Sequence, residues 1–579
     1  MKIAEVSVRR PVFATVVSLL LVILGLLAFD RLAVRELPEV EAPVVSIDVS
    51  YRGAAADVVE TKITQVLEER VSGIEGVTKI TSQSIDGRAS INLEFVPDRN
   101  IDEAANDVRD RVSRVADDLP PEADPPEIAK ADFNAEPVIW LNLSSSTMDV
   151  LELTDYAERV LAERLGVLPG VARVRMGGAR RYAMRVWIDR EALAARQLTV
   201  ADVEAALRRE NVQLPAGRLE SSQREFTLRT ETGLNTEQEF RDLVIGRGAD
   251  GYLVRLREVA DVRLAAENER SLSRSNGVPG ISIGVEQISK ANTLEVTRAV
   301  KDEMERIRTQ LPPGTVLEVN FDRSLFIRES MKEVVVALVI SVLLVLGVIY
   351  LFLGNLRATL IPAVTIPVSI IASFLVMASL GFTINVLTLL GLVLAIGLVV
   401  DDAIVVLENI YRRMERHEPP LIAAIDGSRE IGFAVIATTL VLVAVFVPIS
   451  FLQGNVGKLF REFGITVAAA VMFSSLVALT LTPMMASKLL AGGATRSRLS
   501  DVVDAFFHRL SAWYETQLRR LMRRPWLVVG GTLGAMVVAA LLFRALPSEL
   551  APAEDRGMLF LGLTGPEGSS LEYMDRNAR

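Results

Sequence analysis

Two adjacent aspartates, Asp401 and Asp402, interrupt an apolar stretch that reads AIGLVVDDAIVVLENI over residues 395–410. The apolar run continues after them, which argues against a water boundary just before the pair. An acid near the middle of a bilayer costs about 2.5–3.5 kcal/mol on insertion scales, so such a residue is a candidate functional group. Neighbouring carboxylates in a poorly hydrated site repel one another, which favours keeping a proton on one of them. The pair is therefore predicted to bind and release protons near neutral pH, as a proton relay.

Helical spacing predicts which residues accompany the two aspartates. Residues seven apart lie nearly over one another on a helix, which places Glu408 and Asn409 in line with the pair as possible relay support. Glu408 lies near the end of the apolar run, where a position at the water boundary is the better interpretation. Gly391 and Gly397 are expected to allow close contact with a neighbouring helix.

Composition excludes several classes of protein. Half of the 579 residues are hydrophobic and the mean hydropathy is +0.33, which indicates a membrane protein. The chain has no cysteine and two histidines, so thiol chemistry is excluded and no usual metal site is expected. A net charge of −9 argues against a nucleic-acid partner, and the chain contains no phosphate-binding loop. Neither an enzyme nor a bound cofactor is expected.

Seven stretches have the roughly 20 apolar residues that a helix needs to cross a bilayer. They cover residues 11–29, 334–353, 360–380, 386–407, 432–452, 463–481 and 526–543. The first is longer than a signal-peptide core and lacks a cleavage site, so it is predicted to be a retained span. Basic loops after the fourth and sixth spans place the N-terminus in the cytoplasm and residues 30–333 outside. Residues 487–525 have helical apolar spacing and many arginines, which predicts a helix on the cytoplasmic membrane surface, or alternatively one docked on protein.

The outward block repeats one order of strand-like and helix-like patterns. The first copy has strands VVSIDVSY, VTKITSQSI and ASINLEFV, with helices at 54–71 and 101–118. The second has strands EPVIWLNLSS, VARVRMGG and YAMRVWID, with helices near 151–168 and 200–211. This order predicts a duplicated split β-α-β, ferredoxin-like unit. A further piece follows, with ISIGVEQI, a helix at 294–309 and VLEVNFD.

The predicted fold class is an α-helical membrane bundle with α+β subdomains of ferredoxin-like βαβ repeats. The pattern after the seventh span resembles that after the first, so a fragment of a longer protein with two similar halves is expected. The predicted parts are the cytoplasmic N-terminus with span one (1–29), the outward subdomains (30–333) with a hairpin near 212–232, spans two to six (334–486), the amphipathic helix (487–525), span seven (526–545) and the truncated start of a second outward half (546–579).

Several long motifs, in the right order, closely resemble the resistance–nodulation–division (RND) efflux pumps of the hydrophobe/amphiphile, acriflavine-resistance-type branch. They are YLFLGNLRATLIPAVTIPVSI, GFTINVLTLLGLVLAIG, the acid-bearing stretch, and the sequence of spans five and six. The resemblance covers essentially the whole chain, as an N-terminal half. It implies a proton-driven multidrug antiporter of the bacterial inner membrane, homotrimeric or heterotrimeric, which exports amphiphilic small molecules. It also implies a periplasmic adaptor (membrane fusion) protein and an outer-membrane channel as partners.

The resemblance assigns roles to parts of the chain as well. The outward units correspond to the family's porter subdomains, and the hairpin to its docking arm. Asp401 and Asp402 correspond to the relay aspartates, whose usual lysine partner belongs to the second half of such pumps.

Candidate substrate contacts also follow from the resemblance. Phe133, Trp140 and Met176 lie in the region that matches the aromatic drug pocket of multidrug members, and Asn268 and Arg270 match a second pocket edge. This set is more polar than the usual aromatic pocket. Met176 as a core residue and Arg270 as a solvated strand residue are the alternatives.

Three other functions are kept open. One is a heavy-metal pump of the same family, although that branch typically has one acid at the matching position. Another is a protein-export or lipid-handling membrane component with a similar relay. The third is a regulatory subunit of a hetero-oligomer whose own relay does not work.

Overall fold

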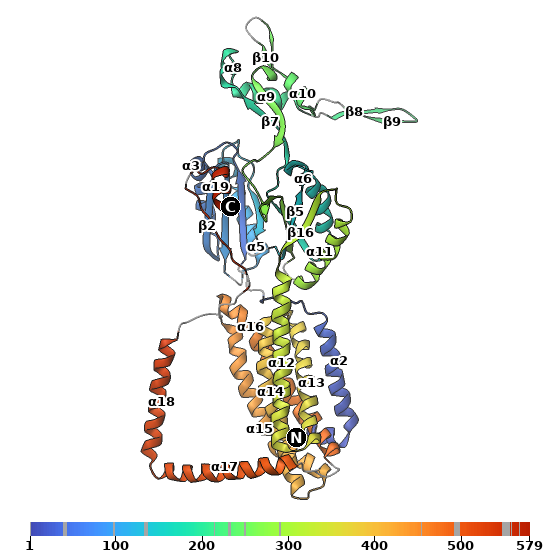
Figure 1. The fold of residues 1–579 in the computed structure, drawn as a ribbon, viewed down its shortest axis with the longest axis vertical. Coiled ribbons are helices and arrows are strands. Elements are labelled where there is room, and N and C mark those ends of the chain that lie inside the picture. Colours follow the sequence, from blue (N-terminus) through green and yellow to red (C-terminus); the bar gives the residue numbers. More distant parts are fainter. Residues whose placement is uncertain are drawn as a thin grey trace. The chain divides into compact units, whose positions relative to one another are not determined.

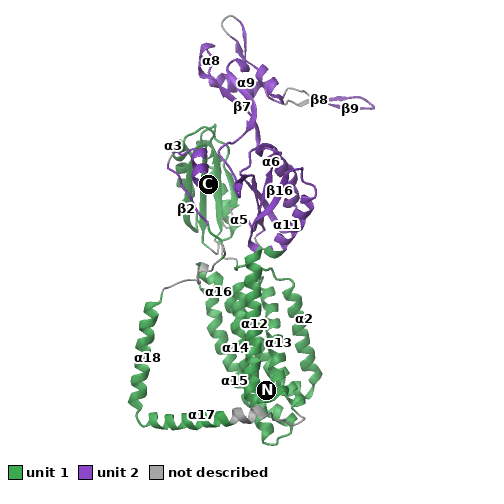
Figure 2. Ribbon diagram, viewed as in Figure 1, with its two compact units in different colours: residues 1–136, 292–294, 324–559 green, residues 137–291, 295–323, 560–579 purple. Residues whose placement is uncertain are grey.

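The computed structural model describes residues 2–38, 43–96, 99–131, 137–212, 215–229, 233–247, 251–288, 291–452, 454–490, 498–546, 556, 558–566 and 568–579. The elements run from α1 to α19 along the chain (Figure 1). They form two compact units, the first made of residues 1–136, 292–294 and 324–559, the second of residues 137–291, 295–323 and 560–579 (Figure 2).

Within the described residues, seven helices, all in or running into the first unit, are long and apolar enough to cross a membrane by length and composition. They are α2 (Pro11–Phe29), α12 (Arg323–Leu353), α13 (Leu356–Ser379), α14 (Val386–Glu415), α15 (Pro420–Phe446), α16 (Gly454–Leu489) and α18 (Pro525–Ala545), with α1 (Lys2–Arg9) before them. Each of the seven predicted spans falls on one of these helices. Several helices are longer than predicted because charged residues at their ends are helical too.

Small residues set the closest helix contacts of the first unit. A Cβ atom added to Gly25 of α2 would lie 2.1 Å from the carbonyl oxygen of Ile371 in α13. The rings of Phe29 and Phe374 then meet in a tilted contact between the same two helices, with centroids 5.0 Å apart. Glycine at the crossing lets the two backbones approach, as is common between membrane helices.

Helix α17 (Arg498–Met522) differs from the spans in being amphipathic. The ring of Phe507 contacts that of Phe352 in α12, with centroids 4.8 Å apart. Trp513 and Tyr514, farther along, are each 60% exposed. The position of this helix on a membrane surface or docked along protein stays a prediction.

The first unit also contains a four-stranded antiparallel sheet in the order β2-β3-β1-β4. Its elements are β1 (Val44–Ser50), α3 (Ala56–Val59), a π-helical segment (Glu60–Thr64), α4 (Gln65–Val71), β2 (Val77–Ile85), β3 (Arg88–Phe95), α5 (Ile101–Ser113), a 3-10 turn (Ala116–Asp118) and β4 (Glu127–Ala131). Alternate strand residues such as Ile47 and Ile91 face one side of the sheet, where Leu67 and Val108 of the helices complete a buried core.

The second unit repeats this topology in the order β16-β5-β15-β6. Its elements are β5 (Ile139–Ser145), α6 (Val150–Tyr156), a π-helical segment (Ala157–Ala162), α7 (Glu163–Gly166), β6 (Val171–Gly177), β15 (Ile281–Gln287), α11 (Thr293–Arg308) and β16 (Thr315–Asp322).

The predicted composition of the second repeat is wrong. YAMRVWID forms β7 (Tyr182–Ile188), which pairs with β12 (Ala260–Ala266) outside this sheet. ISIGVEQI, predicted as a further piece, supplies the third strand as β15, and α11 replaces the helix near 200–211. The alternation of apolar residues marks a strand but does not specify its partner, so an insertion between the second and third strands was not recognised.

The insertion has a small core of its own. Its elements are β7, α8 (Arg190–Ala195), α9 (Val200–Glu210), β8 (Pro215–Glu220), β9 (Glu225–Arg229), α10 (Glu237–Asp242), β10 (Val244–Arg247), β11 (Leu253–Arg255), a 3-10 turn (Leu256–Glu258) and β12. Val203, Phe240 and Val262 are buried in it. The β8–β9 ribbon lies within the predicted hairpin segment, and its facing residues Leu219 and Phe226 are 60% and 57% exposed.

The last described segment also belongs to the second unit. Helix α19 (Leu571–Ala578) is tied to the short β13 (Arg274–Ser275), which pairs with β14 (Val278–Pro279). The Arg274 guanidinium donates to both oxygens of Asp575, at 2.9 and 3.1 Å. Hydrogen bonds from Arg274 and Arg579 lower the pKa of the Asp575 carboxyl to about 2.

Candidate functional site

The two aspartates lie in the interior of α14 and have different environments. The helix begins after the N-cap residue Asn385 and continues to Glu415, beyond the predicted end at residue 407. Asp402 is 8% exposed, whereas Asp401 is exposed. Successive residues of a helix point about 100° apart, so one carboxylate faces the inside of the bundle and its neighbour faces outward.

Asp402 faces α16, the most buried of the membrane helices. Ser474 of α16 adjoins its carboxyl group and donates its own hydroxyl proton to the carbonyl oxygen of Val399, at 2.8 Å. The Oδ2 atom of Asp402 is buried and has no hydrogen-bond partner among the described residues. A buried polar atom left in this state is costly, and membrane acids of this kind usually have a functional role.

Asp401 belongs to an exposed stripe along α14. Leu390, Leu394 and Val405 are between 38% and 46% exposed, and Asp401 and Glu408 are exposed at positions on the same face. The spacing of three or four residues brings these side chains into one row. Residues seven apart therefore lie on the same face of the helix, as expected. Asp401 and Glu408 are on the exposed face, and Asp402 and Asn409 are on the buried face.

The two glycines expected at helix contacts have different surroundings. A Cβ atom on Gly391 would lie 3.2 Å from Cδ2 of Phe463 and 3.3 Å from Cγ2 of Val467, both on α16. Gly391 thus permits close α14–α16 packing, as predicted. Gly397 has no such neighbour within 4 Å among the described residues, so the predicted close contact is not found there. Gly397 lies on the exposed stripe.

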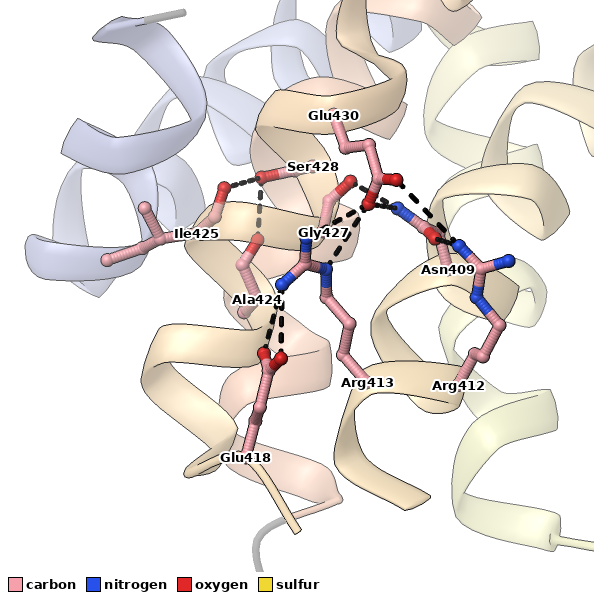
Figure 3. A network of polar contacts seen from close by, with 9 residues as sticks. All are labelled: Asn409, Arg412, Arg413, Glu418, Ala424, Ile425, Gly427, Ser428 and Glu430. Atoms are coloured by element: carbon pink, nitrogen blue, oxygen red, sulfur yellow. Dashed lines mark hydrogen bonds and ion pairs between the residues drawn. The ribbon is translucent and has the colours of Figure 1, made fainter. Parts of the chain in front are cut away.

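Asn409 connects α14 to α15 at the end of the candidate site (Figure 3). Its amide nitrogen donates to the carbonyl oxygen of Gly427, at 2.8 Å, and to Glu430, at 3.2 Å. Its amide oxygen accepts a hydrogen bond of 2.6 Å from Arg412. The nitrogen end of the Asn409 amide therefore links α14 to α15, while its oxygen end bonds within α14.

Arg413 extends the same polar network (Figure 3). Its guanidinium donates to Glu430, with the shorter bond at 3.0 Å, and to both oxygens of Glu418, at 3.1 and 3.2 Å. Glu418 lies in the turn between α14 and α15. The network thus fixes the ends of both helices where the apolar runs give way to charged residues.

Sequence reasoning missed one buried membrane acid, Glu462 of α16, which is 9% exposed. It accepts hydrogen bonds from Thr383 and Asn385, in the turn between α13 and α14. The only signal in the sequence was an acid directly before the span predicted to start at residue 463. Thr383 and Asn385 are far from Glu462 along the chain, so the position of the acid before a span did not reveal them as its partners.

The candidate substrate residues of the second unit do not form one surface. Trp140 of β5 lies opposite Gly284 of β15, whereas Met176 of β6 lies opposite Ile283. Paired residues share a face and successive residues alternate, so Trp140 and Met176 are on opposite faces of the sheet. Met176 packs against the helix-covered core, which supports its alternative interpretation as a core residue. Phe133 lies outside the described residues.

Asn268 and Arg270 are both exposed, in a loop that follows β12. The side-chain oxygen of Asn268 accepts a hydrogen bond from the backbone N–H of Arg270, at 2.8 Å. Asn268 therefore shapes its own loop, and the Arg270 side chain is exposed. Their predicted contact with substrate stays a prediction.

The face of the sheet that contains Trp140 carries charges that sequence reasoning overlooked. Glu286 is 3% exposed and lies beside Arg173 and Arg175, with oxygen–nitrogen distances of 2.8 and 3.2 Å. Alternation in VARVRMGG places the two arginines on one face, which was the available signal. This face therefore combines an aromatic ring with paired charges.

The helical bundle and the mixed α/β sheets fit a multi-pass membrane transport protein. Residues 3–579 match the AcrB/AcrD/AcrF family, and the chain belongs to this RND transporter family, as the resemblance predicted. A curated relative, described as an uncharacterized transporter of Haemophilus influenzae (strain ATCC 51907 / DSM 11121 / KW20 / Rd), is 36% identical over 574 residues. That match covers 99% of this chain and 55% of the relative, so the chain spans about half of the relative's length. Family and helices fit a protein of the bacterial inner membrane.

Proposed function

We propose that the chain is part of a proton-driven efflux transporter that exports amphiphilic small molecules. The observation that carries this proposal is the buried carboxylate of Asp402 between α14 and α16, next to the exposed carboxylate of Asp401. One proton crossing the membrane field gains about 2.3 kcal/mol per 100 mV, and a membrane acid that binds and releases protons can couple this energy to helix movement.

The exposed stripe of α14 supports the proposal that another part of the transporter packs against Asp401. Leaving Asp401 in lipid costs about 2.5–3.5 kcal/mol, so a polar or cationic group from the rest of the transporter covers this face in our proposal. When a proton neutralises a carboxylate, that attraction weakens and α14 shifts against its neighbours. The two strand orders β2-β3-β1-β4 and β16-β5-β15-β6 support the assignment of the sheets as ferredoxin-like porter subdomains that respond to this shift outside the membrane.

The face of the second sheet that carries Trp140 supports amphiphilic substrates. Trp140 offers an aromatic surface, and the charges of Arg173, Arg175 and Glu286 lie on the same face. Molecules with an apolar body and a charged or polar group match this combination. A trimer, a periplasmic adaptor protein and an outer-membrane channel complete the proposed export route.

Removing the charge of either aspartate tests the proposal. In cells that express the complete transporter gene, Asp401→Asn and Asp402→Asn are expected to reduce efflux to the level of cells without the transporter. The reason is that asparagine cannot bind and release a proton while its size and helical position are kept. Accumulation of a fluorescent amphiphilic dye measures the effect.

A matched control is Asp426→Asn on the neighbouring helix α15, which is expected to retain efflux. Membrane expression and gel-filtration profiles of all three variants are expected to match the wild type. Wild-type dye efflux by both Asp401→Asn and Asp402→Asn would contradict the proton-relay function.

A further inference from the structure

Glu462 is a second buried membrane acid, separate from the aspartate pair. Its Oε2 atom accepts three hydrogen bonds: from the backbone N–H of Thr383 at 3.3 Å, from the Thr383 hydroxyl at 3.1 Å and from the Asn385 amide at 2.7 Å. Three donors converge on one buried carboxylate oxygen, which makes a built site rather than a chance contact.

The residues that Glu462 holds form the start of α14. Asn385 is the N-cap of this helix: its side-chain oxygen accepts from the Thr388 N–H, at 2.9 Å, while its amide nitrogen donates to Glu462. The Thr388 hydroxyl in turn accepts from the Asn385 N–H, at 2.9 Å. A change at Glu462 therefore acts directly on the first turn of α14.

The chain segment after α2 meets the same place. Arg35 donates its backbone N–H to the carbonyl oxygen of Ile384, at 3.0 Å, and Ile384 donates to Ala33, at 2.9 Å. The positive charge of Arg35 interacts with Glu462. The carboxylate thus lies where segments from α2, α14 and α16 come together.

From Glu462 toward the aspartates, α14 and α16 stay in contact along their length. Phe463 and Val467 of α16 pack against Gly391 of α14, and Ser474 then reaches the Val399 carbonyl next to Asp402. From Glu462 to Ser474 the distance along the helix is about 18 Å. Glu462 and Ser474 are thus two hydrogen-bonding residues of α16 that hold α14. Together they determine the position of α14 along the axis of α16.

We propose that Glu462 is a positioning residue for proton-coupled transport, which clamps the start of α14 to α16 and so keeps Asp402 beside Ser474. The inference rests on the proposed transport function and adds a residue to it. Glu462 acts here as a hydrogen-bond acceptor for Thr383 and Asn385. It does not carry the transported proton.

Substitutions that keep or remove the acceptor separate these roles. Glu462→Gln keeps an oxygen for Thr383 and Asn385, so transport within about twofold of wild type is expected. Glu462→Leu removes the acceptor and is expected to lower the maximal transport rate about tenfold or more, since small misplacements of reacting groups have effects of this size. The substrate concentration at half-maximal rate is expected to stay unchanged, because the clamp is in the helix bundle and not in a substrate site.

Two further variants keep the test valid if Glu462→Leu folds poorly. Thr383→Val removes one donor while preserving shape, and Asn385→Ala removes the other. Each is expected to reduce the rate in the same direction, and Thr383→Val combined with Glu462→Leu is expected to be no worse than Glu462→Leu alone, because both break one clamp. Arg461→Gln, at the adjacent exposed position of α16, is the matched control with wild-type transport.

The measurements use the full-length transporter in proteoliposomes with an imposed pH gradient, with Asp402→Asn assayed alongside. Loss of transport in Glu462→Gln equal to that in Glu462→Leu would overturn the inference, because the ionisable carboxyl itself would then be required. Wild-type rates in both Glu462→Leu and Thr383→Val would also overturn it. If Asp402→Asn transports like the wild type, the proposed function fails, whatever the Glu462 variants do.

Discussion

At the residue scale, Asp401 and Asp402 show how one step along a helix changes the environment of a side chain. The Asp402 side chain is buried where α14 packs against α16, whereas Asp401 lies on the exposed stripe of α14 with Glu408. The same rotation separates Asn409, which bonds to Gly427 of α15, from Glu408. The two aspartates therefore have different roles in the proposal. Asp402 interacts with α16, and Asp401 interacts with the polar or cationic group that covers the exposed stripe.

The ion pair between Arg274 and Asp575 gives a second prediction at this scale. Asp575→Asn is expected to lower the thermal stability of the full-length protein slightly, because Arg274 loses its bidentate acceptor. Arg274→Asp alone is expected to be more harmful, since it places two acids together. The double variant Arg274→Asp with Asp575→Arg is expected to recover most of the loss in a thermal-unfolding measurement. No recovery in the double variant would show that the pair does not hold α19.

The pH dependence of this ion pair follows from the lowered pKa of Asp575, about 2. A depressed pKa means that the ionised carboxylate stabilises the folded state above the unfolded value of about 3.9. That contribution decreases as the pH falls through the range between these values and is lost below about 2. The difference in melting temperature between wild type and Asp575→Asn is therefore expected to be constant from pH 5 to pH 7 and to shrink as the pH falls below about 4.

At the element scale, the contact between α14 and α16 is the critical packing of the bundle. Gly391→Val is expected to separate these helices, since even a Cβ atom there lies within 3.3 Å of Phe463 and Val467. Overpacking of this kind typically costs about 1–3 kcal/mol. Both the melting temperature in detergent and the transport rate are expected to fall. Gly347→Val on α12 is the control, because no neighbouring atom lies within 4 Å of its Cβ position among the described residues. Equal stability of the two variants would argue against close packing at Gly391.

At the scale of the whole molecule, the two sheets share one strand order although their chain segments differ greatly in length. The second sheet tolerates the long insertion between β6 and β15 because the insertion has its own core. Its β8–β9 ribbon adds exposed apolar side chains that the core does not use. A contiguous exposed apolar patch typically marks a surface that meets a partner, and we propose that Leu219 and Phe226 belong to such a surface on the docking arm.

Replacing the ribbon's apolar residues tests this role. Leu219→Ser with Phe226→Ser is expected to leave the melting temperature of the protein unchanged, because both side chains are exposed. The same variant is expected to weaken trimer assembly about tenfold or more if the two residues are interface anchors. Native mass spectrometry at several concentrations measures the trimer fraction. Val167→Ser, at an 82% exposed position, is the control with normal assembly, and an unchanged trimer in the ribbon variant would exclude it as a docking arm.

The sequence by itself determined the features that depend on neighbouring residues. Apolar runs of bilayer length located the seven membrane helices, because hydropathy is a local property. The acids in the middle of such a run identified the candidate relay, since a charge in lipid is costly wherever the helix packs. Alternation marked most of the strands for the same reason, including β5 and β15.

Only the tertiary structure decided which of these residues meet. It buried Asp402 and exposed Asp401, because burial depends on where α16 packs. It placed Trp140 and Met176 on opposite faces of one sheet, and assigned β15 to that sheet in place of β7, because strand pairing joins segments far apart in the chain. It brought Glu462 to Thr383 and Asn385, nearly 80 positions earlier in the chain. Contacts of this kind depend on how whole elements pack, and no local pattern of residues contains that information.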